Sequence, residues 1–66
     1  MEIIFNNQAH QISQSSLQHI LNELVGNQQK SIAVAVNERV VPKSEWDSYL
    51  LQQNDNVLVI KATPGG

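Results

Sequence analysis

The sequence predicts a small α+β domain in which a mixed five-stranded sheet packs on one α-helix. A single helical stripe of apolar residues interrupts segments of strand character, in the order strand, strand, helix, strand, strand, strand. The first and last of these segments are both strongly apolar, so we expect them to lie side by side in the middle of the sheet. A chain of 66 residues buries only about 60% of its unfolded surface, which predicts one domain with an efficient core.

Residues 2–5 and 9–12 are expected to form a β-hairpin. In the first segment Ile3 and Phe5 alternate with Glu2 and Ile4, and extended character resumes in the second. Asn6-Asn7 between them tolerates the left-handed backbone that a tight hairpin turn requires. His10 shares parity with Ile12, so His10 is expected over the apolar face near the edge of the hairpin.

A helix is expected to begin at about Ser16 and to end at Gly26. Ser15 is expected to cap the first turn, with Gln18 reaching back three residues later in a capping box. Gly26 supplies the left-handed residue that commonly follows a last turn. The apolar positions recur at i, i+3, i+4, i+7 and i+8 and form one wide stripe: Leu17, Ile20, Leu21, Leu24 and Val25.

Residues 31–37 alternate large and small apolar side chains, so the large ones are expected to pack under the helix as a strand. Residues 39–41 form the next strand, and Pro42 lacks a ladder donor, which predicts a sheet edge. Residues 43–49 are expected to form one irregular or helical turn that carries Trp46 as a packing residue. Leu50-Leu51 are expected to anchor this segment, and Asn54-Asp55 to form a turn.

The last strand, residues 56–61, is apolar on both faces. Val57 and Val59 can face the helix, which leaves Leu58 and Ile60 on the other side. One helix cannot cover both faces of a sheet, so these two residues, with Ile4, are expected to form an exposed apolar patch that docks a partner. The alternative is that the segment 43–53 folds over them.

The boundary of the domain is expected after residue 62, with residues 63–66 as a flexible tail. Pro64 has no N–H for a ladder, and Gly65-Gly66 can pass through a channel too narrow for a side chain. The carboxylate of Gly66 is ionised at neutral pH and is a poor electrophile, so its chemistry requires activation from outside. The chain has no phosphate-binding loop to supply that activation itself, and 66 residues leave no room for a catalytic cleft, so we expect a protein co-substrate and not an enzyme.

Composition excludes several classes of function. The chain has no cysteine, which excludes disulfides, thiolate metal sites and a persulfide of its own. Its net charge is −2 and its four cations are scattered, which argues against nucleic-acid binding. It shows neither a signal peptide nor an apolar run of roughly 20 residues, so we expect no membrane association and a cytoplasmic location.

Other polar residues are expected to be structural or solvated. His10 and His19 have no partners at a metal-ligand spacing, so no metal site is expected. Glu45 and Asp47 lie on a short exposed segment, where nothing buries them to tune a pair for acid–base catalysis.

Several residues together are similar to a known family. The pattern comprises Val36-Asn37, the run Val40-Val41-Pro42-Lys43-Ser44-Glu45-Trp46, Leu50, Asn54-Asp55, Val57 and Gly65-Gly66. It resembles the ThiS family, the sulfur carrier proteins of thiamine biosynthesis, over essentially the whole chain. Two positions depart from the family pattern, because Asn54 stands where glycine is common and Pro64 precedes the two glycines. The resemblance implies a ubiquitin-like β-grasp fold.

The resemblance also implies a mechanism. An activating enzyme of the ThiF type would use ATP and Mg²⁺ to adenylate the Gly66 carboxylate, so the carrier itself would bind no cofactor. A persulfide on a donor protein would then displace AMP and leave a thiocarboxylate, which a thiazole synthase of the ThiG type would consume. Gly66 would carry the reacting group and Gly65 would permit its passage.

Three alternatives are left open. The small subunit of molybdopterin synthase shares the fold and the Gly-Gly end, but its members tend to be longer and lack the Pro-Lys-Ser-Glu-Trp stretch. A ubiquitin-like protein modifier would instead join Gly66 to lysines of target proteins. A non-catalytic interaction module would have an inert tail and would keep its function when Gly65-Gly66 is removed.

Overall fold

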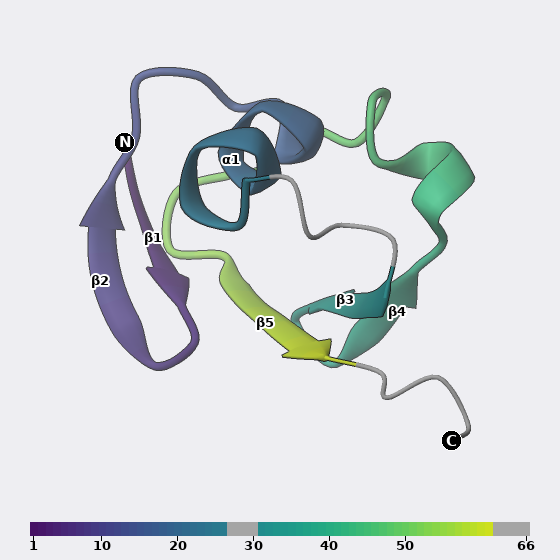
Figure 1. Ribbon diagram of the computed structural model, residues 1–66. Coiled ribbons are helices and arrows are strands. Elements are labelled where there is room, and N and C mark those ends of the chain that lie inside the picture. The colour runs from purple at the N-terminus through teal and green to yellow at the C-terminus, as the bar shows by residue number, and fades with distance from the viewer. Residues whose placement is uncertain (27–30, 62–66) are drawn as a thin grey trace.

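The computed structural model describes residues 1–26 and 31–61. The predicted boundary after residue 62 and the predicted tail, residues 63–66, lie outside the described residues. The elements follow the predicted order (Figure 1): β1 (Glu2–Phe5), β2 (Gln8–Gln11), α1 (Leu17–Leu24), β3 (Ile32–Val36), β4 (Arg39–Val41), a short 3-10 helix (Lys43–Glu45) and β5 (Asn56–Lys61). The predicted α+β class is confirmed.

The five strands form one mixed sheet in the order β2-β1-β5-β3-β4. β1 and β5 are parallel, and the other neighbouring pairs are antiparallel. The first and last strands therefore lie side by side, with β5 in the centre, as their apolar character predicts. β4 is an edge strand, as the following Pro42 indicates. The helix α1 lies across one face of the sheet (Figure 1).

Paired left-handed residues make both tight turns of the sheet. Asn6 and Asn7 have φ values of 48° and 68°, which suits the two-residue turn between β1 and β2. Asn37 and Glu38, with φ values of 52° and 71°, turn β3 into β4 in the same way. The expected hairpin is confirmed.

The predicted position of His10 is also confirmed. Its Cα pairs with that of Ile3, which is fully buried, so the two side chains lie on the same face of the sheet. The rings of His10 and Phe5 meet edge to face, with their centroids 5.8 Å apart.

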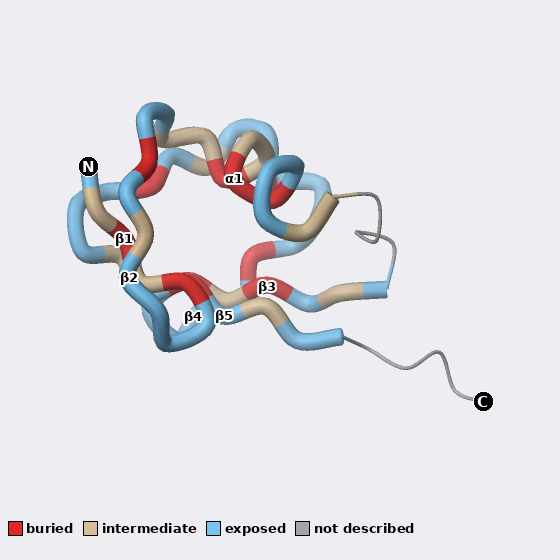
Figure 2. The backbone as a smooth tube through the Cα atoms, turned by 60° about the vertical axis from the view of Figure 1, so that its left-hand side comes forward, coloured by how far each residue is buried: buried red, intermediate tan, exposed pale blue. Residues whose placement is uncertain are grey.

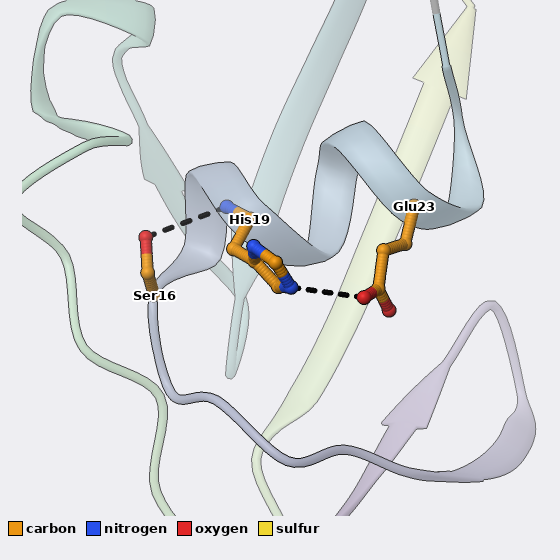
Figure 3. Close-up of polar contacts among 3 residues, drawn as sticks. All are labelled: Ser16, His19 and Glu23. Carbon is orange, nitrogen blue, oxygen red and sulfur yellow. Dashed lines mark hydrogen bonds and ion pairs between the residues drawn. The ribbon is translucent and has the colours of Figure 1, made fainter.

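The start of the helix corrects the sequence-based expectation. Ser16, not Ser15, is the N-cap, and its hydroxyl accepts a hydrogen bond of 3.4 Å from the His19 N–H (Figure 3). The Ser15 carbonyl instead accepts a 2.7 Å hydrogen bond from the Leu51 N–H. This contact holds Ser15 outside the helix, so the expected capping box with Gln18 is wrong. Two adjacent serines are equivalent in sequence, and a distant segment selects between them.

The end of the helix agrees with expectation. Gly26 has a φ of 75°, and its N–H donates to the Leu21 carbonyl at 3.1 Å. The apolar stripe is deeply buried over its first two turns, but Leu24 remains 38% exposed. The stripe therefore covers the sheet less completely toward the C-terminal end of α1.

The core lies between α1 and the sheet. Figure 2 shows the buried stretches on the helix and on strands that face it. The buried apolar residues come from all parts of the described chain: Ile3, Phe5, Ile12, Leu17, Ile20, Leu21, Val34, Val36, Val41, Trp46, Leu51 and Val57. Burial of this set supplies the main stabilising term of so small a domain.

The segment 43–53 packs on the helix side of the sheet. Trp46 is a core residue, as predicted, and its indole N–H donates to the Val41 carbonyl at 2.9 Å. The N–H groups of Leu17 and Gln18 donate to carbonyls of this segment at 3.0 and 3.1 Å. These bonds satisfy donors that a helix N-terminus leaves without intrahelical partners. The alternative in which this segment covers the outer face of β5 is therefore wrong.

The expected anchor at Leu50-Leu51 is confirmed for one residue only. Leu51 is buried in the core, whereas Leu50 is 65% exposed. Leu50 and Ser16 form an isolated antiparallel bridge, so their backbones meet while the Leu50 side chain faces solvent.

The N-cap assignment makes a testable prediction. Ser16→Ala should lower the free energy of unfolding by about 1 kcal/mol, because one helix N–H loses its acceptor. Ser15→Ala should change it by less than about 0.5 kcal/mol, because its contribution is a backbone carbonyl that alanine retains. Urea unfolding of the two variants measures both values. A larger loss for Ser15→Ala would contradict the assignment.

Candidate functional site

The outer face of β5 carries the predicted apolar patch. Leu58 and Ile60 are 42% and 56% exposed on the side of the sheet that faces away from α1. Ile4 is half-buried, and pairing with β5 places its side chain on the same face. The expected exposure is confirmed, and the docking role of these residues stays a prediction.

Cross-strand pairing extends this surface beyond the predicted residues. Ala35 lies opposite Leu58, and Ala33 lies opposite Ile60. Val40 lies opposite Ala35 and is also exposed. Directly paired residues point to the same face, so one apolar surface crosses four strands. We call it the open-face patch: Ile4, Ala33, Ala35, Val40, Leu58 and Ile60.

Val40 was missed as a site residue for an identifiable reason. Val40 and Val41 are identical neighbours, so the sequence of residues 39–41 does not indicate which of the two faces away from α1. In the structure Val41 is buried and Val40 is exposed, because successive side chains of a strand point to opposite faces. Val40 joins the open-face patch because β4 pairs with β3 and β3 pairs with β5.

A polar clamp fixes the start of β5. The Asn37 side-chain amide donates to the Asp55 carboxylate at 2.9 Å, and its oxygen accepts from the Asn56 N–H at 2.9 Å. The Asp55 carboxylate also accepts from the Gln52 N–H at 2.8 Å. Asn54, with a φ of 69°, makes the turn that brings Asp55 into place. Asn37 and Asp55 therefore hold the β3–β4 turn against the first residue of β5.

Asn6 holds the other half of β5. Its backbone N–H donates to the Val57 carbonyl at 2.9 Å, and its side-chain oxygen accepts from the Val59 N–H at 2.8 Å. The Asn6 side chain thus supplies a hydrogen-bond acceptor to β5 at a point where β1 has ended and the hairpin turn has begun. Asn6 positions the segment of β5 that leads to the C-terminal residues.

A groove lies on the helix side of the sheet at this same end of β5. It has a volume of about 410 Å³ and is lined by Phe5, Asn6, Leu24, Val25, Ile32, Val59 and Lys61. Sequence reasoning missed it, because these residues come from four elements that only the fold brings together.

The remaining polar candidates do not form a catalytic or metal site. His19 Nε2 lies 2.9 Å from Glu23 Oε1 in an exposed pair one helical turn apart (Figure 3). Within residues 1–26 and 31–61, no three His, Cys, Asp or Glu side chains gather closely enough to hold a metal ion. Glu45 and Asp47 are both exposed, as expected for a short surface segment.

Two further expectations concern membrane-spanning helices and the C-terminal residues. None of the helices in the described part of the chain is long and apolar enough to cross a membrane. Pro64, Gly65 and Gly66, which the sequence marks as the reactive tail, lie outside the described residues.

Comparison with known proteins gives three agreeing matches. The model of the ThiS family matches residues 3–66. The sulfur carrier protein ThiS of Escherichia coli (strain K12) is 33% identical over 66 residues, which are 100% of both chains. The crystal structure of a thiamine biosynthesis protein (ThiS) from Geobacter metallireducens matches 100% of both chains with a TM-score of 0.86 and 20% identity. The fold is accordingly the ubiquitin-like β-grasp.

The polar clamp predicts a measurable coupling between its two side chains. Asp55→Ala should cost about 1–2 kcal/mol of unfolding free energy, since two hydrogen bonds to a carboxylate are lost. Asn37→Gly removes the other side chain while keeping a residue that tolerates positive φ. In a urea-unfolding double-mutant cycle, the coupling energy should reach about 0.5 kcal/mol or more. Strictly additive losses would show that the two side chains act independently.

Proposed function

The chain belongs to the ThiS family, and from that premise we propose that it carries sulfur for thiamine biosynthesis as a thiocarboxylate at Gly66. The observation that carries this proposal is the family match, which runs to residue 66 and so includes Gly65-Gly66. The full-length likeness to a sulfur carrier ThiS favours this function over that of a molybdopterin synthase subunit.

Activation of Gly66 is the first proposed step. A carboxylate oxygen of Gly66 attacks the α-phosphorus of ATP in a ThiF-type enzyme, which supplies the Mg²⁺ site, and pyrophosphate leaves. The product is an acyl-adenylate, whose AMP is a far better leaving group than the oxygen of a free carboxylate. The carrier contributes only the acyl group.

Sulfur transfer is the second proposed step. The terminal sulfur of a donor protein's persulfide attacks the acyl carbon, and AMP departs. A thiol then reduces the resulting acyl disulfide, which leaves a thiocarboxylate on Gly66 and a disulfide between the thiol and the donor. A ThiG-type thiazole synthase takes up this sulfur. The carrier has no cysteine, so its own residues cannot compete for the persulfide.

In this scheme the folded domain is the part of the chain that partner enzymes bind. Five residues follow Lys61, and a fully extended chain of that length spans at most roughly 18 Å. An enzyme that acts on Gly66 must therefore approach the C-terminal end of β5 closely. Leu58 and Ile60 of the open-face patch lie on this strand. The exposed apolar surface of the patch supports a docking role for Leu58, Ile60 and Ile4.

The chemistry at Gly66 can be tested by intact mass. Incubation of the chain with ATP, Mg²⁺, a ThiF-type enzyme and a persulfide donor with thiol should raise its mass by about 16 Da, because sulfur replaces one oxygen. A variant that lacks Gly65-Gly66 should gain nothing under the same conditions. If the full chain instead becomes joined to lysines of other proteins, the molecule is a protein modifier and the proposal fails.

The docking role of the open-face patch has its own test. Leu58→Asp should raise the KM for the chain in adenylation about tenfold or more, because a charge would enter an apolar interface. Its urea-unfolding midpoint should change little, since Leu58 is already partly exposed. Leu50→Asp is a control with the same substitution, because Leu50 is also an exposed leucine but lies at the isolated bridge to Ser16. Unchanged adenylation kinetics for Leu58→Asp would remove the patch from the mechanism.

A further inference from the structure

We propose that the enzyme that adenylates Gly66 adds an extended segment to the free edge of β5 at Val59–Lys61 and inserts one apolar side chain into the groove beside α1. This inference rests on the proposed function and deepens it, because it names a second contact with the same enzyme. It concerns the helix side and the edge of β5, whereas the open-face patch lies on the opposite face.

The first observation is the direction of the backbone groups at the end of β5. Along an antiparallel ladder, alternate residues bond to the neighbouring strand. Val59 donates its N–H to Asn6, on the β1 side of β5, so its carbonyl also points away from β3. Lys61 lies two residues further on and has the same orientation. The Val59 carbonyl and the Lys61 N–H therefore face the β1 side.

The second observation is that β1 ends too early to pair with these groups. β1 ends at Phe5 and pairs with β5 only at Asn56 and Val57. Asn6 adds one side-chain bond and then turns the hairpin. Within the described ranges, no strand lies beside Val59–Lys61 on this side. A free strand edge in the centre of a sheet is a template for an added strand.

The third observation is the groove that borders this edge. Val59 and Lys61 line it together with the apolar side chains of Phe5, Leu24 and Val25. Side chains on one strand alternate between faces, so a strand added beside Val59–Lys61 would direct every second side chain toward the groove. Its volume of about 410 Å³ suits a large apolar side chain, and Lys61 favours a neighbouring carboxylate.

The length of chain beyond Lys61 limits where the adenylating enzyme can lie relative to the edge and the groove. Because only five residues separate Lys61 from Gly66, an active site that holds Gly66 must lie within roughly 18 Å of Lys61. The edge and the groove both include Lys61, so both lie within that distance of the active site that adenylates Gly66. Main-chain hydrogen bonds combined with a side-chain pocket constitute recognition by β-strand addition.

The edge is tested with two substitutions at one position. Lys61→Pro removes the N–H that faces the free edge, and proline is tolerated where an N–H lies outside the ladder. Lys61→Ala removes the charge but keeps the N–H. With the full chain as varied substrate of a ThiF-type enzyme, Lys61→Pro should raise the KM about threefold to tenfold above that of Lys61→Ala, with kcat little changed.

The groove is tested separately. Leu24→Gln keeps a good helix former but removes apolar lining, and it should raise the KM about fivefold to twentyfold. Leu50→Gln removes an exposed leucine that lies beside the N-cap residue Ser16, at the opposite end of α1 from Leu24, and it should leave the KM unchanged. Amide hydrogen exchange of the unsubstituted chain gives an independent measure, because the Lys61 amide should become protected when the enzyme binds.

The outcomes separate this inference from the proposed function. If Lys61→Pro behaves as Lys61→Ala, Leu24→Gln behaves as the unsubstituted chain and the Lys61 amide gains no protection, the inference is overturned while adenylation of Gly66 stands. If the unsubstituted chain yields no AMP or pyrophosphate, the proposed function fails, and this inference fails with it.

Discussion

The coverage of β5 by a single helix is the constraint on which the structure depends. β5 is the central strand, so its hydrogen bonds connect the two halves of the sheet. α1 and the segment 43–53 both pack on one face, where Val57 is fully buried. The domain has no further element for the other face within the described residues. The apolar side chains of that face therefore stay exposed as a direct consequence of the architecture.

Asparagine side chains set the position of this central strand. Asn6 and Asn37 both stand at left-handed turn positions, which asparagine tolerates better than most residues. Each also uses its side chain to bond the backbone of β5, at Val59 and at Asn56 respectively. The two ends of β5 are thus tied to the two tight turns of the sheet. Asparagine therefore has two roles here: its backbone forms the turn, and its side chain holds β5, the strand that precedes the C-terminal residues.

This arrangement suits a sulfur carrier of the ThiS family whose proposed chemistry takes place on partner enzymes. The residue that is proposed to react, Gly66, follows the central strand. At its start β5 has a neighbouring strand on both sides, and at its end the side toward β1 is free within the described residues. Around that finish lie an apolar face, an open edge and a groove, all within reach of an enzyme that binds the end of the chain. In the proposed mechanism, enzymes act on Gly66 in succession, and these three surfaces are available to them.

The sequence by itself determined the elements, the central position of β1 and β5 and the apolar face of Leu58 and Ile60. These follow from local signals: hydrophobic period, glycine and asparagine turns, and a strand that is apolar on both sides. The tertiary structure alone decided that Ser16 caps the helix, that Leu50 is exposed, that Val40 joins the patch and that a groove forms beside Lys61. Each of these depends on contacts between residues far apart in the chain, such as the Leu51 bond to Ser15, and a local pattern carries no record of such contacts.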